Sequence, residues 1–223
     1  MNNSGDDFIA PACHEQISLL FQDEHILLIN KPSGLLSLSG KNPLNKDSVH
    51  FRLVQSYPQA TLAHRLDFGT SGIMLVALSK VVNAELTRQF QNRTVAKTYI
   101  SILMGTVAND SGEIVAPIAK DKANFPLQKI CADEGKYAAS RYQVINHLQN
   151  PSRTRVAFTP STGRTHQLRI HSREFGHPIL GCDLYGSPQT HALAERLLLH
   201  ADSLSFEHPV SRQRMTVQCP CPF

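Results

Sequence analysis

The chain has 223 residues, of which 41% are hydrophobic and 18% are charged, a composition typical of a folded domain rather than of a disordered chain. A chain of this length can bury a substantial core as one domain. No stretch approaches the roughly 18 uncharged apolar residues of a membrane-spanning helix. Residues 1–7 lack the pattern of a secretory signal, so we expect a cytoplasmic protein without membrane contact.

The first half of the chain alternates between strand and helix signals. Residues 1–20 are weakly patterned, and we expect them to form a loose arm. The predicted elements are, in chain order, a strand at 26–29, a helix at 47–55 capped by Asp47, a strand at 73–78, a helix that starts after Ser79, and a strand at 95–104. Val82, Leu86 and Phe90 recur at every fourth residue of the second helix and predict its buried stripe.

The second half of the chain predicts mostly strands. In chain order these elements are strands at 112–117, 140–147 and 153–159, helices at 164–175 and 188–199, and strands at 204–206 and 215–217. Within 153–159, Val156 and Phe158 alternate with arginines, which predicts one core face and one basic face. Many strands with few helices between them predict an α+β protein, built on a largely antiparallel mixed sheet flanked by helices and loops.

The positive charge is concentrated in one segment. Residues 141–173, called the arginine-rich segment below, contain six arginines and no Asp, Glu or Lys, in a chain whose net charge is only +4. Such a density of arginine is typical of a surface that binds phosphates. The segment therefore predicts a nucleic-acid partner.

Common cofactor and metal motifs do not fit the sequence. The stretch 34–42 has the wrong spacing for a phosphate-binding P-loop and lacks its Ser or Thr. His166 and His171 are five residues apart and would not share a helix face, as a zinc-binding pair must. The five cysteines, two of them in the C-P-C tail at 219–221, predict neither a disulfide framework nor a complete zinc site. We expect no cofactor, no nucleotide and no metal.

Three short motifs combine acidic, basic and aromatic groups. In HRLDFGTSG, at 64–72, two glycines and two hydroxyls predict a tight loop that presents Asp67 and Arg65. Lys97 and Tyr99 are two residues apart on a predicted strand and therefore share a face. GRTHQLR, at 163–169, opens a predicted helix inside the arginine-rich segment.

The sequence resembles the pseudouridine synthases of the RluA type. The motifs that carry the resemblance are FQDEHILLINKPSGLLS at 21–37, HRLDFGTSG at 64–72, AKTYI at 96–100, GRTHQLRIH at 163–171, GHPILGCDLYG at 176–186 and LLLHADSLSFEHP at 197–209. Their order and spacing fit over nearly the whole chain. The resemblance implies a pseudouridine synthase fold, with one catalytic domain over residues 21–223 and no room for the S4 domain that many relatives carry.

The resemblance also implies a reaction and its partners. Such enzymes detach uracil from C1′ of a uridine in RNA, turn the base and rejoin it through C5. The resemblance is especially close to members that act on stem-loops of both 23S rRNA and tRNA, so we expect these RNAs as partners of a monomeric isomerase. Breaking a glycosidic bond requires a carboxylate, and Asp67 matches the catalytic aspartate of the family. Tyr99 matches its tyrosine, which acts as a base or proton relay, and Arg169 matches the arginine that keeps the aspartate ionised.

The target base must leave its stem-loop before it can react. By resemblance, Arg65 fills the space that the flipped base vacates. We further predict RNA contacts from five other side chains, namely His64, Lys97, Arg153, Arg155 and Arg164.

Two other functions are compatible with the residues alone. An RNase-like acid–base enzyme that uses His64, His166 and Tyr99 would cleave RNA instead of isomerising it. A non-catalytic RNA-binding module would need the arginine-rich segment but neither Asp67 nor Tyr99.

Overall fold

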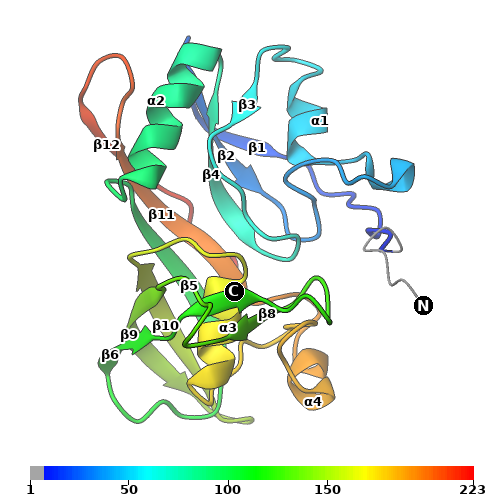
Figure 1. Cartoon of the computed structure of the whole chain (residues 1–223), viewed down its shortest axis with the longest axis vertical. Coiled ribbons are helices and arrows are strands. Elements are labelled where there is room, and N and C mark those ends of the chain that lie inside the picture. The colour runs from blue at the N-terminus through cyan, green and yellow to red at the C-terminus, as the bar shows by residue number, and fades with distance from the viewer. Residues whose placement is uncertain (1–7) are drawn as a thin grey trace. The chain divides into compact units, whose positions relative to one another are not determined.

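The structure is a computed structural model that describes residues 8–223 (Figure 1). Contacts between residues divide the chain into two compact units, which we call unit 1 (the chain through Lys97, with Ala201–Pro222) and unit 2 (Thr98–His200, with Phe223). A ten-stranded sheet has the order β1-β2-β4-β11-β5-β10-β9-β6, with β12 paired to β11 and β3 to β4. Because the strand pairs within each unit are antiparallel and few helices accompany them, the predicted α+β class is confirmed.

The strands of unit 1 are β1 (Ser18–Gln22), β2 (Ile26–Lys31), β3 (Thr61–Leu62), β4 (Ser71–Ala77), β12 (Arg214–Gln218) and most of β11 (Leu199–Glu207). Its helical elements are the 3-10 turn η1 (Pro43–Asn45) and the helices α1 (Val49–Leu53) and α2 (Lys80–Gln91). β2 and β4 form the centre of its core, since β4 is buried along its whole length and β2 nearly so. α2 contacts β4, with Val82 and Leu86 buried, as the apolar spacing predicts (Figure 1).

Two helix caps of unit 1 can be compared with their predictions. Ser79 caps α2, because its side chain accepts a hydrogen bond from the backbone N–H of Val82, and that prediction is confirmed. The Asp47 cap is wrong, because α1 begins at Val49 and its cap is Ser48, whose hydroxyl accepts from the N–H of Phe51 at 3.1 Å. Asp47 instead pairs with the guanidinium of Arg52.

The predicted arm at 1–20 lies partly outside the described residues. Residues 8–17, which we call the arm below, contain no helix or strand, and β1 begins directly after them.

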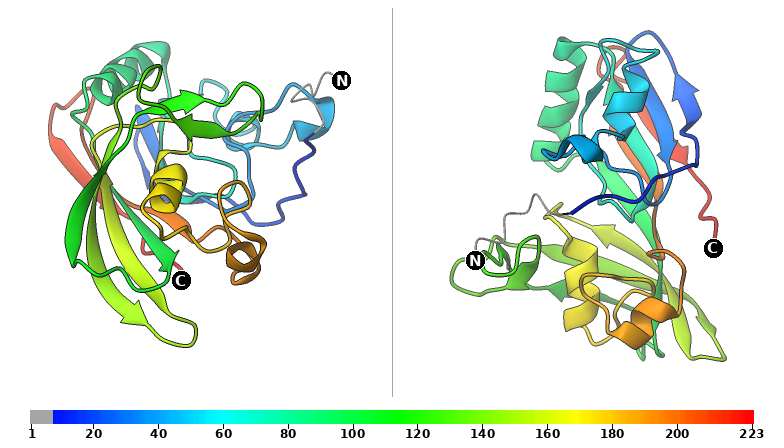
Figure 2. Two further views of the ribbon diagram at one scale, coloured as in Figure 1. Left: turned by 60° about the horizontal axis from the view of Figure 1, so that its bottom comes forward. Right: turned by 90° about the vertical axis from the view of Figure 1, so that its right-hand side faces the viewer.

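The elements of unit 2 are the remaining strands β5 (Ala96–Met104, which begins in unit 1), β6 (Ser111–Val115), β7 (Ile118–Lys120), β8 (Gln128–Ile130), β9 (Ala139–Leu148) and β10 (Arg153–Pro160), with the helices α3 (Gln167–Glu174) and α4 (Pro188–Ala192). β10 pairs with β5 on one side and with β9 on the other (Figure 2). Val156 and Phe158 of β10 are fully buried while Arg153 and Arg155 keep some exposure, which confirms the predicted alternation.

Unit 2 corrects three predictions. α3 begins at Gln167 rather than at 164, because His166 adopts a left-handed conformation (φ 55°) that ends the preceding turn. α4 ends at Ala192, since Leu199 belongs to strand β11, where it is buried. The antiparallel pair β7–β8 was not predicted at all. None of the described helices is long and apolar enough to cross a membrane.

Candidate active site

Asp67 lies in unit 1, in the loop of residues 63–70 that joins β3 to β4. We call this segment the Asp67 loop. Asp67 is partly exposed and Arg65 is exposed, whereas Leu66 between them is buried. The hydroxyl of the buried Ser37 donates to the carbonyl of Leu66 at 2.7 Å and accepts from its N–H at 3.2 Å. The backbone immediately before Asp67 is therefore hydrogen-bonded in both directions.

The backbone after Asp67 is held by the same segment, residues 31–37. The N–H of Gly34, which has φ +73°, donates to the carbonyl of Phe68 at 3.0 Å. The hydroxyl of Ser33 donates to the carbonyl of Gly69 at 2.7 Å. Because these bonds are made to the main chain, they fix the path of the loop whatever the state of the carboxylate.

Lys31 supports this arrangement from the end of β2. It is fully buried, and its ammonium donates to the carbonyls of Pro32, Leu35 and Phe68 at 2.9, 2.7 and 3.1 Å. A buried charge is tolerated only when it is well hydrogen-bonded. Lys31 thus connects the turn after β2 directly to the Asp67 loop.

Gly72 explains why the motif ends in glycine. It has φ +111°, and a Cβ atom there would lie 2.2 Å from the carbonyl oxygen of Ala201. No other residue fits this close approach, so Gly72 sets where the loop enters β4.

His64, at the start of the motif, connects the Asp67 loop to β4. Its Nε2 accepts a hydrogen bond from the N–H of Leu75 at 2.9 Å, and its ring stacks on Phe90 with centroids 4.5 Å apart. Burial, helped by the positive charge of Lys97, lowers the pKa of His64 to about 3. His64 is therefore a neutral imidazole that carries its proton on Nδ1 and stabilises the loop.

Lys97, near His64 in unit 1, is half-buried. Burial lowers its pKa, and the nearby charge of Arg93 lowers it further. Among the described residues, neither Lys97 nor Arg93 pairs with a carboxylate. Two neighbouring cations without an acidic partner are suited to a phosphate group.

Arg169 lies in unit 2 on α3, with 4% of its surface exposed. Its guanidinium pairs with Asp183, its Nε donates to the sulfur of Cys182 at 3.4 Å, and its Cζ lies 5.5 Å from the ring centroid of Tyr185. Arg173, one turn along the helix, covers the same ring at 5.4 Å. Two guanidinium groups and an aromatic ring thus form one cation–π cluster.

Tyr99 lies on β5, opposite Phe158 of β10, and packs against the core of unit 2 while staying partly exposed. In the same unit, the hydroxyl of Tyr185 is hydrogen-bonded to Nδ1 of His166 at 2.8 Å and accepts from the N–H of Gln128 at 2.8 Å. Each tyrosine is therefore held by its surroundings, Tyr99 by packing and Tyr185 by hydrogen bonds.

The polar residues of GRTHQLRIH divide between two roles. Gln167 is buried and donates to the carbonyl of Ala139 and to the hydroxyl of Ser140 at 3.0 and 2.9 Å. His171 is buried as well, and its two ring nitrogens are hydrogen-bonded to Ser140 and to the carbonyl of Ala116. Burial lowers the pKa of His171. These two side chains connect α3 to β9, and Arg169 projects from the helix toward Asp183 instead.

The arginine-rich segment is less uniform than its composition suggests. Three of its arginines pair with carboxylates, namely Arg141 with Glu113, Arg169 with Asp183, and Arg173 with Glu174. Two others donate to backbone carbonyls, Arg153 to Pro151 and Gln149, and Arg164 to Tyr137, while Arg155 donates to the terminal oxygen of Phe223. Arg153 and Arg164, which donate to neutral carbonyls, keep their net charge available for phosphate.

The structure distributes the predicted site residues over both units. Unit 1 holds His64, Arg65, Asp67 and Lys97, and unit 2 holds Tyr99, Arg153, Arg155, Arg164 and Arg169. Sequence reasoning assigned no role to Asp183 and Tyr185, although both belong to the motif GHPILGCDLYG. It also missed Lys31, whose only signal was its place beside the turn. Within residues 8–223, no three His, Cys, Asp or Glu side chains are grouped as metal ligands.

Comparisons with known proteins identify the family of the chain. A family profile described as RNA pseudouridylate synthase matches residues 25–174. The chain is 49% identical to the dual-specificity RNA pseudouridine synthase RluA of Haemophilus ducreyi, over 92% of this chain and 94% of the relative. It is 47% identical to the protein of the same description in Yersinia pestis, over 92% and 99% of the two chains.

A solved structure shares the fold. Human RNA pseudouridylate synthase domain containing 1 is similar with a TM-score of 0.80 at 28% identity, covering 96% of this chain and 86% of the human one. The profile match, the identities and the motif residues described above agree, and the chain belongs to the RluA family of RNA pseudouridine synthases.

Proposed function

We propose that this RNA pseudouridine synthase has dual specificity and isomerises uridine in stem-loops of both 23S rRNA and tRNA. The relatives from Haemophilus ducreyi and Yersinia pestis are described as dual-specificity enzymes, and each matches over more than nine-tenths of this chain. We further propose that the protein acts as a cytoplasmic monomer, with residues 21–223 as its catalytic domain.

The observation that carries the mechanism is the main-chain support of the Asp67 loop. A carboxylate that acts on C1′ or C2′ of the sugar must be presented at a fixed position, and Ser37 and Ser33 bond the backbone on either side of Asp67. In this proposal Asp67 starts cleavage of the glycosidic bond. Arg169 supplies the positive charge that favours the ionised carboxylate. Tyr99 packs on the uracil and accepts or relays the C5 proton.

RNA binding is assigned to cations that are exposed or that pair with no Asp or Glu side chain among the described residues. Arg65 is exposed next to Asp67 and fills the place of the flipped base. Lys97, Arg153, Arg155 and Arg164 contact phosphates, and His64 contributes indirectly by holding the motif in place. The energy of these contacts offsets the few kcal/mol that flipping a base costs.

The RNase-like alternative loses support at His64. An acid–base histidine must exchange protons near neutral pH, whereas the pKa of His64 is about 3 and its Nε2 accepts a backbone hydrogen bond. A purely RNA-binding module would not need the elaborate support of a single aspartate.

Asp67→Asn tests the proposal directly. The substrate is a stem-loop of about 17 nucleotides, such as an anticodon arm, labelled with tritium at C5 of uridine. We expect the wild-type protein to release tritium without shortening the RNA, and Asp67→Asn to bind the RNA but release none. Asp110→Asn, an exposed aspartate of unit 2, is the matched control and should keep full activity.

Shortened RNA would support the RNase-like function instead. Activity of Asp67→Asn within about tenfold of wild type would remove Asp67 from catalysis. Modification of full-length tRNA but not of the isolated stem-loop would contradict recognition of a small hairpin.

A further inference from the structure

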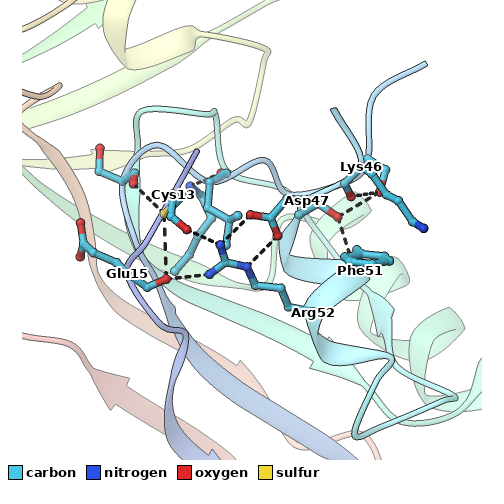
Figure 3. A network of polar contacts seen from close by, with 11 residues as sticks. Cys13, Glu15, Lys46, Asp47, Phe51 and Arg52 are labelled. Atoms are coloured by element: carbon cyan, nitrogen blue, oxygen red, sulfur yellow. Dashed lines mark hydrogen bonds and ion pairs between the residues drawn. The ribbon is translucent and has the colours of Figure 1, made fainter. Parts of the chain in front are cut away.

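The arm, residues 8–17, is hydrogen-bonded to the rest of unit 1 through Asn45, through Arg52 and through Ser33, whose carbonyl accepts from the thiol of Cys13 at 3.7 Å. One of these points is Arg52 of α1, whose guanidinium donates to the carbonyls of Cys13 and Glu15 at 2.5 and 2.6 Å (Figure 3). Asp47 accepts two further hydrogen bonds from the same guanidinium, at 2.7 and 2.6 Å. The bidentate pair orients the planar guanidinium so that its remaining donors point at the arm.

Another point is Asn45 of η1, which is buried. Its Oδ1 accepts from the N–H of Ala10 at 2.8 Å, and its Nδ2 donates to the carbonyl of Phe8 at 2.6 Å. One amide side chain thus hydrogen-bonds the arm in both directions, as a neighbouring strand would. This arrangement fixes the backbone of residues 8–10 although they belong to no strand.

The end of the arm contacts the Asp67 loop. The ring of Phe8 meets the ring of Phe68 edge-on, with centroids 5.6 Å apart and planes at 80°. This is a preferred geometry for two aromatic rings. Phe68 directly follows Asp67, and its carbonyl is the one that Gly34 and Lys31 hold.

The Asp67 loop is therefore supported from two directions. Residues 31–37 bond its backbone, and Phe8 contacts the side chain of Phe68. Leu36 and Ser37 in turn accept hydrogen bonds from the N–H groups of Val49 and His50 at the start of α1, the helix that carries Arg52. The arm, α1 and the support segment thus form one connected set of contacts around the loop.

We propose that the arm is a positioning element for catalysis: Asn45 and Arg52 hold it in place, and Phe8 braces Phe68 so that Asp67 keeps its reactive orientation. The inference rests on the proposed function of Asp67. Phe8 acts through Phe68 and touches neither substrate nor reacting atoms. Its effect therefore falls on the chemical step and not on RNA affinity.

Phe8→Ala tests this role, with Ile9→Ala as its matched control. The two residues are adjacent and almost equally exposed, at 52% and 54%, but Ile9 carries no ring that could pair with Phe68 as Phe8 does. We expect Phe8→Ala to lower the single-turnover rate on the labelled stem-loop about tenfold, less than the roughly 100-fold that a displacement of 1 Å can cause. The dissociation constant for the RNA should not change. Phe8→Tyr should restore the rate, and Ile9→Ala should match wild type.

A second variant and a second measurement distinguish loss of the arm contact from loss of activity for another reason. Asn45→Asp keeps the acceptor for Ala10 but loses the donor to Phe8, so its rate should fall as in Phe8→Ala. Amide hydrogen exchange of residues 66–70 should become faster in both variants and stay unchanged in Ile9→Ala, and this readout does not depend on activity.

An active wild type with unchanged rate and unchanged exchange in Phe8→Ala would overturn the inference. Weaker RNA binding at an unchanged rate would also overturn it, because Phe8 would then be an RNA contact. Faster exchange in a protein that modifies no RNA would instead reject the proposed function and leave the physical support of the loop established.

Discussion

The two units present their site residues by different physical means. In unit 1, the loop of Asp67 is held by hydrogen bonds to its main chain from Ser33, Gly34, Ser37 and Lys31. In unit 2, Arg169 is oriented by contacts between side chains, with Asp183 and the ring of Tyr185. Loss of a buried hydrogen bond leaves unpaired main-chain groups, whereas a partly exposed ion pair is readily replaced by water. The placement of the carboxylate should therefore be far less tolerant of substitution than the placement of the cation.

After Asp67→Asn, Tyr99→Phe should have the largest effect, and it shows whether unit 2 supplies chemistry besides charge. The ring that packs opposite Phe158 remains, so stability and RNA binding should stay near wild type. Loss of the hydroxyl should lower the rate of product formation about 100-fold, the range of general base catalysis. Single-turnover release of the C5 proton is the measurement. A near-normal rate would restrict unit 2 to binding.

Ser37→Ala and Asp183→Asn compare the two kinds of support directly. Ser37 is buried, and its removal leaves both backbone groups of Leu66 without their partner, which should lower the free energy of unfolding by about 1–3 kcal/mol. The Asp183 side chain is 59% exposed, and asparagine keeps an oxygen that can accept from the buried guanidinium of Arg169, so this substitution should change stability by less than about 1 kcal/mol. Urea denaturation measures both. Equal losses would refute the proposed difference between the units.

Lys97→Met and Arg141→Met compare a cation of unit 1 with one of unit 2. Lys97 has no carboxylate partner among the described residues, while Arg141 is paired with Glu113. Removal of a phosphate contact should reduce the slope of log K against log salt by about 0.7 on a single-stranded loop. We expect that change for Lys97→Met and a smaller one for Arg141→Met. The opposite ranking would place the RNA on the outer strands of unit 2.

His64→Gln should have the smallest effect, visible only as a pH dependence of stability. Glutamine can still accept from Leu75 but does not titrate. The folded-state pKa of about 3 lies below that of an unfolded histidine, about 6.5, so protonation favours the unfolded chain. The contribution of His64 is fully present above about pH 6.5 and is lost as the pH falls toward 3.

The measurement is the melting temperature from about pH 7.5 to pH 4.5. Relative to His64→Gln, the wild type should lose stability over this range. Parallel curves for the two proteins would mean that His64 takes up its proton at the same pH in the folded and the unfolded chain.

Much of the fold was predictable because its signals are local. The apolar runs of β2 and β4 are buried on both faces, and the stripe of α2 follows helical spacing. The errors lie where contacts with other residues, and not residue type alone, determine the local structure. Asp47 is a good helix cap by type, but Arg52 binds it, and Ser48 takes the cap. Residues near Leu199 suit a helix, yet the sheet gains more by burying them as a strand.

The candidate site was predictable only in part for the same reason. Asp67, Arg65 and Tyr99 stand in motifs whose residue types already indicate chemistry. Lys31 could not be found this way, because lysine is almost never fully buried and only the three carbonyls around its ammonium explain it. Asp183 and Tyr185 are recognisable only through their contacts with Arg169.

The burial of Lys31 has a practical consequence. Amine-reactive acylating reagents modify exposed lysines within the folded protein, but they can reach the Lys31 ammonium only when the surrounding structure opens. The extent of acylation at this one position, measured by mass spectrometry, would therefore report how often the structure around Lys31 unfolds locally. Acetylation of the folded enzyme should likewise spare Lys31 while it labels Lys41 and Lys46, both of which are exposed.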